Sequence, residues 1–182
     1  MYKNFLWTGR EYYSLENCIV KSVSDGFEVD SVIVGKYQGE IYRVQYTIHL
    51  NEAWFTTSVE ALCIHKEIEK RYILEADTRG HWKLNGQPTS AFNGCLDIDI
   101  PVTPFTNSLP VNRMQLTPGN EAEISVIYID LLNSSVRPLK QKYKRISDTV
   151  YHYENIPNDF EADITVDDNG FVIDYPGLFF RS

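Results

Sequence analysis

The sequence has little cysteine and histidine and none of the short motifs that mark common enzyme classes. Three cysteines (Cys18, Cys63 and Cys95) are an odd number at wide spacing, which argues against a disulfide framework or a zinc knuckle. The four histidines are scattered singly, without a His-x-x-x-His pair. No Gly-x-Ser-x-Gly, Gly-x-x-x-x-Gly-Lys or Gly-x-Gly-x-x-Gly segment occurs. The sequence therefore gives no sign of serine-hydrolase, phosphate-loop or dinucleotide chemistry, and we expect no metal and no cofactor.

Positive charge is also scarce. Lys and Arg number 17 against 25 Asp and Glu, which gives a net charge of −8. A chain of this sign is a poor partner for nucleic acid or for an anionic membrane surface. Apolar runs stay well below the roughly 20 residues that cross a bilayer, so we expect no integral membrane segment. Residues 1–11 lack the apolar core of a secretion signal, and together with reduced thiols this predicts a cytoplasmic protein.

Aromatic residues are by contrast abundant, at 13% of 182 residues, with 12 tyrosines among them. Tyrosine joins a flat apolar ring to a polar tip, which suits a surface that contacts a half-hydrated ligand. Strands also favour aromatic residues, so this composition by itself does not separate a binding surface from an ordinary β-protein. The length suits one domain, 1–182, with a substantial core.

Period-two alternation is the main signal of secondary structure. The segment from Tyr42 to Leu50 alternates apolar or aromatic residues with polar ones, so we expect Tyr46 to be buried and Arg43 to be exposed. Turn signals lie at 25–26, 77–80 and 167–170, and a Pro-Gly turn lies at 117–120. Further strands are expected at 27–34, 71–76, 81–84, 123–132, 139–146, 150–153, 160–166 and 171–175.

These signals predict an all-β, mainly antiparallel fold. Many short strands at regular spacing favour a single curled sheet, either a spiral β-roll or a half-open barrel with a central cavity, because curling protects the edges. A barrel of this size can enclose a ligand. Helix signals are few, and residues 59–70 fit either a strand or a helix.

The segment from Cys95 to Arg113 holds the densest set of specific polar groups. It begins as a strand that places Asp97 and Asp99 on one face, roughly 6.5–7 Å apart. Prolines then predict a long polar loop that carries Asn107 and ends at Arg113.

Three interpretations of the two acids stay open. They can pin the loop through hydrogen bonds, bind a ligand, or act as a glycosidase carboxylate pair. Because Arg113 is a natural carboxylate partner, we expect it within hydrogen-bonding reach of Asp97 or Asp99.

Two further groups are candidates for the site. A segment of alternating residues contains Lys140, Lys142 and Lys144, with Gln141 and Tyr143 between them. The lysines predict a solvated outer face of the sheet. Gln141 and Tyr143, on the opposite face, predict either a polar lining of a cavity or a buried hydrogen-bond network. The tryptophans at 54 and 82 fit either the core or a platform on which a sugar ring stacks.

A set of motifs extends over nearly the whole chain. They are Gly94-Cys-Leu-Asp-Ile-Asp, Thr103-Pro-Phe-Thr-Asn, Leu109-Pro, Arg113, the Tyr42 and Tyr46 strand leading to Trp54, Gly80-His-Trp82, Gln141-x-Tyr143, and 167–181 with Tyr175-Pro-Gly. Together they resemble the core signature of the bacterial glycolipid-binding family, formerly a domain of unknown function, with one departure at Asn112, where a second basic residue is expected.

The resemblance implies a spiral antiparallel β-roll shaped like bacterial lipoprotein carriers, with an amphipathic lipid or glycolipid in its cavity. This step from fold to function is an analogy. The alternatives are an enzyme that acts on a sugar or lipid through Asp97 and Asp99, and an interaction module whose interior is filled by its own side chains. Binding is favoured over catalysis, and no catalytic residue is assigned. The expected ligand-binding residues are Asp97, Asp99, Asn107, Arg113, Gln141, Tyr143, Trp54 and Trp82.

Overall fold

A computed structural model describes residues 1–77 and 80–182. The predicted turn at 77–80 therefore includes two positions, 78 and 79, that lie outside the described residues. The first half of the chain forms what we call the N-terminal wing. Its strands are β1 (Tyr2–Gly9), β2 (Ser14–Val23), β3 (Gly26–Tyr37), β4 (Glu40–Asn51), β5 (Thr56–His65), β6 (Ile68–Ala76), β7 (Trp82–Leu84) and β8 (Gln87–Thr89).

The second half forms the C-terminal wing and contains the helical segments. Its elements are β9 (Asp97–Asp99), the 3-10 helix η1 (Phe105–Asn107), α1 (Ser108–Met114), β10 (Glu121–Asp130), β11 (Ser135–Arg145), β12 (Val150–Ile156), β13 (Glu161–Val166), β14 (Val172–Tyr175) and β15 (Phe179–Arg181).

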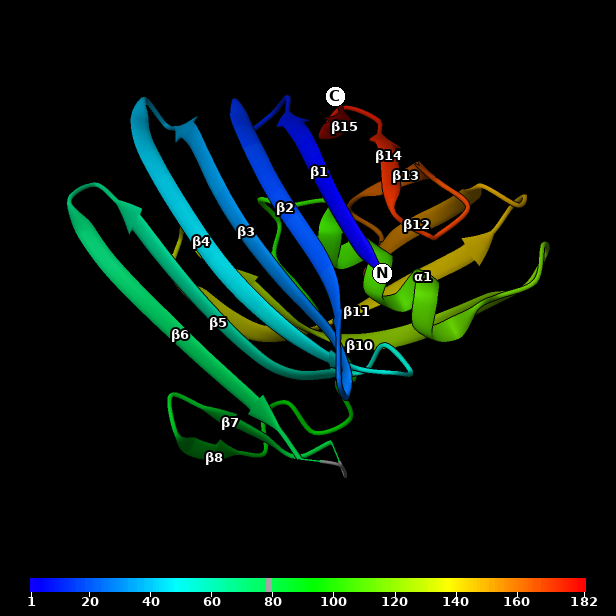
Figure 1. The fold of residues 1–182 in the computed structure, drawn as a ribbon, viewed down its shortest axis with the longest axis horizontal. Helices are drawn as coiled ribbons and strands as arrows, with labels where there is room; N and C mark the ends of the chain where they lie inside the picture. The colour runs from blue at the N-terminus through cyan, green and yellow to red at the C-terminus, as the bar shows by residue number, and fades with distance from the viewer. Residues whose placement is uncertain (78–79) are drawn as a thin grey trace.

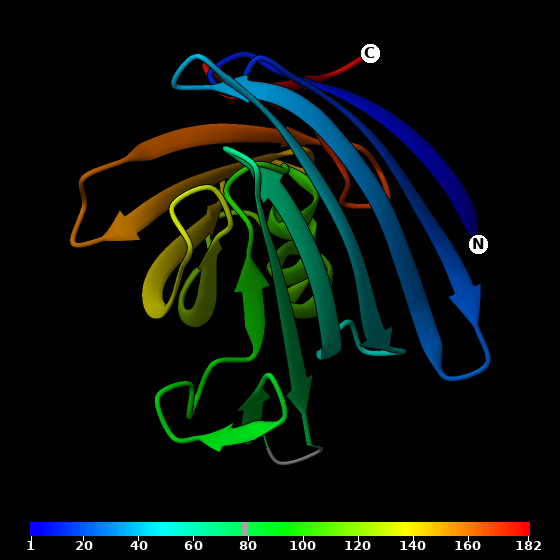
Figure 2. The same ribbon diagram turned by 90° about the vertical axis from the view of Figure 1, so that its left-hand side faces the viewer.

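All the strands join one sheet in the order β8-β7-β6-β5-β4-β3-β2-β1-β15-β14-β13-β12-β11-β10-β9. Neighbours are antiparallel, apart from β9 and β10, which run parallel. The wings meet where β1 pairs with β15, and the sheet curls there without closing, because β8 and β9 remain as its two ends. Figures 1 and 2 show α1 held between the wings. The predicted curled antiparallel sheet is confirmed.

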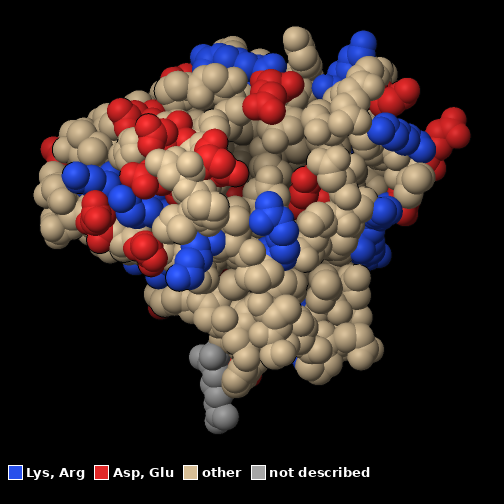
Figure 3. All heavy atoms as spheres, turned by 180° about the vertical axis from the view of Figure 1, so that it is seen from behind, with Lys and Arg blue, Asp and Glu red and all other residues tan. Residues whose placement is uncertain are grey.

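Alternation determines which face of each strand is buried. On β4, Tyr42 and Tyr46 are buried while Arg43 is exposed, as the sequence predicts. On β11, Gln141 and Tyr143 are buried and Lys140 is exposed. Seen from behind, basic and acidic side chains lie among one another on the upper part of the molecule, whereas its lower part is largely uncharged (Figure 3).

Two parts of the chain differ from the sequence prediction. The expected polar loop after β9 is instead η1 followed by α1, and residues 102–111 are buried. Pro110 is compatible with α1 because it lies in the first turn, where backbone N–H groups have no partner within the helix. Residues 59–70, which fitted either a strand or a helix, belong mostly to β5 and β6. The strands β1 and β2 were not predicted from the sequence.

The apolar interior consists of two clusters that meet at α1. Leu109 belongs to the larger cluster, which is packed mainly against the N-terminal wing, and Val111 belongs to the smaller one in the C-terminal wing. The short helix therefore fixes the position of one wing relative to the other. No helix among the described residues is long and apolar enough to cross a membrane.

Candidate functional site

The two acids of β9 lie at the centre of the fold. Pairing with β10 places Asp97 opposite Val126 and Asp99 opposite Tyr128. The two carboxylates share a face of the strand, as expected, but their surroundings differ. Asp97 is completely buried, whereas Asp99 is half-buried and lines a cavity.

Asp97 forms an ion pair with Arg113 from the last turn of α1. Arg113 Nε donates to Asp97 Oδ1 at 3.0 Å, and Nη2 donates to Oδ2 at 2.6 Å. The guanidinium also lies over the Phe55 ring, 5.4 Å from its centroid. Burial raises the pKa of Asp97, and the hydrogen bond and charge of Arg113 oppose that rise. The predicted contact of Arg113 with an acid of β9 is confirmed, and it uses both carboxylate oxygens of Asp97.

Asp99 is held by neutral groups. Thr106 Oγ1 donates to its Oδ1 at 3.1 Å, and Gln141 Nε2 donates to its Oδ2 at 2.7 Å. Burial raises the pKa of Asp99, while these two hydrogen bonds lower it. Gln141 therefore acts on the cavity through Asp99, because Gln141 is itself buried and does not line the cavity.

Asn107 and Tyr143 form a second buried pair. Tyr143 Oη donates to Asn107 Oδ1 at 2.9 Å, and Asn107 lines the same cavity as Asp99. Burial raises the pKa of the Tyr143 phenol well above its ordinary value, so the hydroxyl stays protonated and can donate. Tyr143 thus orients an amide that a ligand can reach.

Sequence reasoning missed a buried acid on β2. Glu16 is 2% exposed, and its Oε1 accepts hydrogen bonds from Ser31 at 2.7 Å, Tyr46 at 2.7 Å and Thr103 at 2.8 Å. Its Oε2 has no partner among the described residues. Burial raises the pKa of Glu16 to about 7. Alternation of apolar and polar residues could not identify it, because on this strand the apolar Leu15 is exposed and the charged Glu16 is buried.

The cavity itself has a volume of about 200 Å³, and the C-terminal wing lines it together with Glu11 and Tyr12 from the turn between β1 and β2. Six of its thirteen lining residues are aromatic, and polar groups lie at the segment from Asp99 to Asn107. Tyr153, Phe160 and Tyr175 form a triangle with ring centroids 6.1 or 6.2 Å apart. The lining residues are Glu11, Tyr12, Asp99, Pro101, Thr103, Asn107, Tyr128, Tyr153, Asn155, Phe160, Tyr175, Leu178 and Phe179.

The two tryptophans lie outside this cavity. Trp82 is 2% exposed, and its Nε1 donates to the Cys95 carbonyl at 2.9 Å. Trp54 packs against Phe27 and Phe171, with ring centroids 4.7 and 5.9 Å away. Of the eight expected ligand-binding residues, Asp99 and Asn107 line the cavity, and Gln141 and Tyr143 support them from behind.

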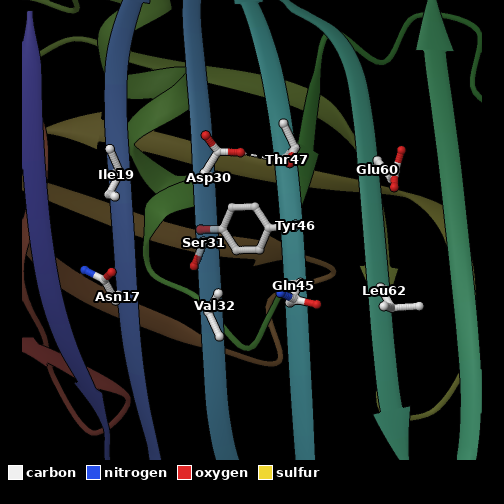
Figure 4. Close-up of a pocket in the computed structure, with 10 residues that line it drawn as sticks. All are labelled: Asn17, Ile19, Asp30, Ser31, Val32, Gln45, Tyr46, Thr47, Glu60 and Leu62. Atoms are coloured by element: carbon white, nitrogen blue, oxygen red, sulfur yellow. Dashed lines mark hydrogen bonds between the residues drawn. The ribbon is translucent and has the colours of Figure 1, made fainter.

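A larger but shallower hollow lies on the outward face of β2 to β5 (Figure 4). Its volume is about 330 Å³, and its polar groups already pair across strands, as when Thr47 Oγ1 donates to Asp30 at 3.0 Å. Tyr46 is the single aromatic residue among the described residues that line it, and Ser31 and Tyr46 are its buried lining residues. The lining residues are Asn17, Ile19, Asp30, Ser31, Val32, Gln45, Tyr46, Thr47, Glu60 and Leu62.

One group of side chains on β12 and β13 has the types and spacing of metal ligands: His152, Glu154 and Glu161. Lys142 Nζ, however, lies 3.2 Å from Glu154 Oε1, and His152 Nδ1 lies 2.7 Å from Asp163 Oδ1. An ion-pair network on the outer face of the sheet accounts for this arrangement.

Comparisons with known proteins agree with the fold. A family model described as "Putative glycolipid-binding" matches residues 4–181. Among solved structures, the chain is similar to a DUF1089 family protein from Pseudomonas aeruginosa, with 34% sequence identity, a TM-score of 0.84 and 92% of each chain covered. A β-barrel-like DUF1849 protein from Brucella abortus gives a TM-score of 0.48 at 9% identity, over 99% of this chain and 93% of that one. No curated protein matches the chain.

Proposed function

The chain belongs to the glycolipid-binding family, and from this premise we propose that it binds an amphipathic small molecule whose head group enters the aromatic-walled cavity. The supporting observation is the lining of that cavity. The rings of Tyr12, Tyr153 and Tyr175 supply aromatic surface against which a sugar ring could pack, and Asp99 and Asn107 offer hydrogen-bonding groups for its hydroxyls.

The size of the cavity supports a head group rather than a whole lipid. Its volume of about 200 Å³ corresponds to roughly seven water molecules at about 30 Å³ each. Sites for drug-sized ligands occupy roughly 300–1,000 Å³. One sugar ring matches this volume, and the apolar chain of the ligand would then extend beyond the cavity.

The catalytic alternative has less support. A glycosidase needs two carboxylates that flank the scissile bond. Asp97 is fully buried and occupied by Arg113, so only Asp99 of the proposed pair reaches the cavity. The alternative of a filled interior is opposed by the cavity itself. We also propose a cytoplasmic location, which the three free cysteines support.

The proposal is tested by titrating the purified protein with octyl glucoside below its micelle concentration, using calorimetry. Tyr12→Ala removes a ring from the cavity wall, whereas Tyr13→Ala removes a neighbouring ring that is 78% exposed. We expect Tyr12→Ala to weaken binding at least tenfold and Tyr13→Ala to leave it unchanged. Equal binding by the two variants would contradict the proposal. Native mass spectrometry of the freshly purified protein provides an independent search for a bound lipid.

A further inference from the structure

The charge of the cavity wall has one sign. Asp99 and Glu11 line it, and no lysine, arginine or histidine is among the described residues that do. The nearby guanidinium of Arg113 is directed at both oxygens of Asp97. A ligand in the cavity therefore meets carboxylates without a compensating cation.

Asp99 also keeps unused capacity to accept hydrogen bonds. An ionised carboxylate has about four acceptor positions. Thr106 and Gln141 supply one donor each, and both donors are neutral. Because Asp99 lines the cavity, its remaining lone pairs are available to a donor that enters there.

The aromatic wall favours the same kind of ligand. The rings of Tyr153, Phe160 and Tyr175 lie at 53° to 70° to one another, and all three line the cavity. Ring faces carry a negative potential and attract a cation within about 6 Å of the centroid. Proteins bind ammonium groups in sites lined by several aromatic rings, and a neighbouring carboxylate adds a charge of opposite sign.

We propose that the head group bound in this cavity carries a positively charged ammonium, which lies against the aromatic wall and pairs with Asp99. This inference rests on the proposed function, because it assigns the charge of the same ligand. An anionic head group is disfavoured by Asp99 and Glu11, and a neutral sugar would leave Asp99 without a charged partner. An amino sugar and a choline-like group both carry this chemistry.

The experiment compares three ligands with the same alkyl chain: octyl glucoside, its 2-amino-2-deoxy analogue and octyltrimethylammonium. We expect the amino glycoside to bind wild-type protein at least tenfold more tightly than the neutral glycoside. Tightest binding of octyltrimethylammonium would likewise support an ammonium site and would identify a choline-like ligand as its source. Equal binding of the neutral and amino glycosides would overturn the inference while leaving the proposed function intact. Failure of all three to bind would contradict both.

Asp99→Asn tests the partner directly, since the amide keeps the shape of the side chain and loses its charge. We expect this variant to bind the neutral and the amino glycoside equally. Asp30→Asn, which alters an acid on the outward face of the sheet, should keep the tenfold preference. A preference that survives in Asp99→Asn would overturn the role given to Asp99. If Asp99→Asn does not fold, the comparison of the ligands on the wild-type protein still decides the charge of the head group.

Discussion

Arg113 and Asp97 meet through two hydrogen bonds, of 3.0 and 2.6 Å, in a place where the aspartate has no exposed surface. One residue belongs to α1 and the other to β9, so the pair ties the only α-helix among the described residues to the edge of the sheet. Asp99, two residues along the same strand, is left facing the cavity. The two neighbouring acids therefore have separate roles, one in the fold and one at the candidate site.

Removing Arg113 should destabilise the protein strongly. Arg113→Met leaves Asp97 as a buried, unpaired carboxylate, and we expect a loss of about 3–5 kcal/mol in the free energy of unfolding. Urea unfolding followed by fluorescence measures it. Arg71→Met is the control, because Arg71 pairs with Glu60 at 2.6 Å with both side chains at least half exposed, so we expect its loss to stay below about 1 kcal/mol. Similar losses in the two variants would contradict the structural role of Arg113.

Glu16 should make stability depend on pH. Its pKa in the folded protein is raised from 4.5 to about 7, so the folded state holds its proton more tightly than the unfolded state does. Its contribution to stability is complete below pH 4.5 and is lost as pH rises through about 7. At pH 8, Glu16→Gln should exceed the wild type by roughly 3 kcal/mol, whereas at pH 4 the two should agree. Asp97 and Asp99 have pKa values raised in the same direction, so the difference between wild type and variant isolates Glu16.

The measurement is urea unfolding at several pH values from 4 to 8. Glu69→Gln changes an exposed acid of β6 and should follow the wild type at every pH. A constant difference between Glu16→Gln and the wild type across this range would argue against a raised pKa of Glu16.

Gly26 should tolerate no side chain. It has a φ of +147°, and a Cβ atom there would lie 2.0 Å from the Leu50 carbonyl oxygen. We expect Gly26→Ala to lose more than about 3 kcal/mol of stability, because backbone strain and a backbone clash add together. Gly177 has a φ of +79° with open space around it, so Gly177→Ala should lose only about 1 kcal/mol. Thermal unfolding compares them, and equal losses would show that the close approach at Gly26 does not matter.

Phe171 should be among the most sensitive apolar positions. Its fully buried ring lies near Phe5, Trp54 and Phe105, at centroid distances of 4.8, 5.9 and 6.5 Å, so it joins three separate parts of the chain. We expect Phe171→Ala to lose about 3–5 kcal/mol, the usual range for a buried phenylalanine. Ile41→Ala, at a side chain that is 73% exposed, should change stability little. A small loss for Phe171→Ala would mean that the wings come together without it.

The sequence predicted the features that are determined by residues close together along the chain. Alternation on β4 identified its buried face, and Arg113 lies close enough along the chain for its contact with β9 to be expected. The prolines after β9 predicted a loop, and this was wrong because Pro110 lies in the first turn of α1. Proline is tolerated in the first turn of a helix but not in its interior. The wings meet through contacts between distant segments, such as Glu16 with Thr103, and local patterns carry no information about these.

The cavity was unpredictable for the same reason. Its walls come from the turn after β1, from residues 99–107, from β10, and from the segment that runs from β12 to β15. The abundance of tyrosine was visible in the composition, but which tyrosines gather around Asp99 follows only from the curling of the sheet.

The junction of β1 with β15 has a consequence for how the protein is made. Trp7 pairs with Arg181, so β1 leaves the ribosome well before the strand with which it pairs. Strands β1 to β8 can meanwhile pair with their sequence neighbours as a meander. The slow, late event is the pairing of β1 with β15, because contacts of large sequence separation form at a high entropic cost. Until β15 has been made, the nascent chain therefore holds half a sheet with an uncovered apolar face, and the cavity, which Phe179 of β15 helps to line, is incomplete.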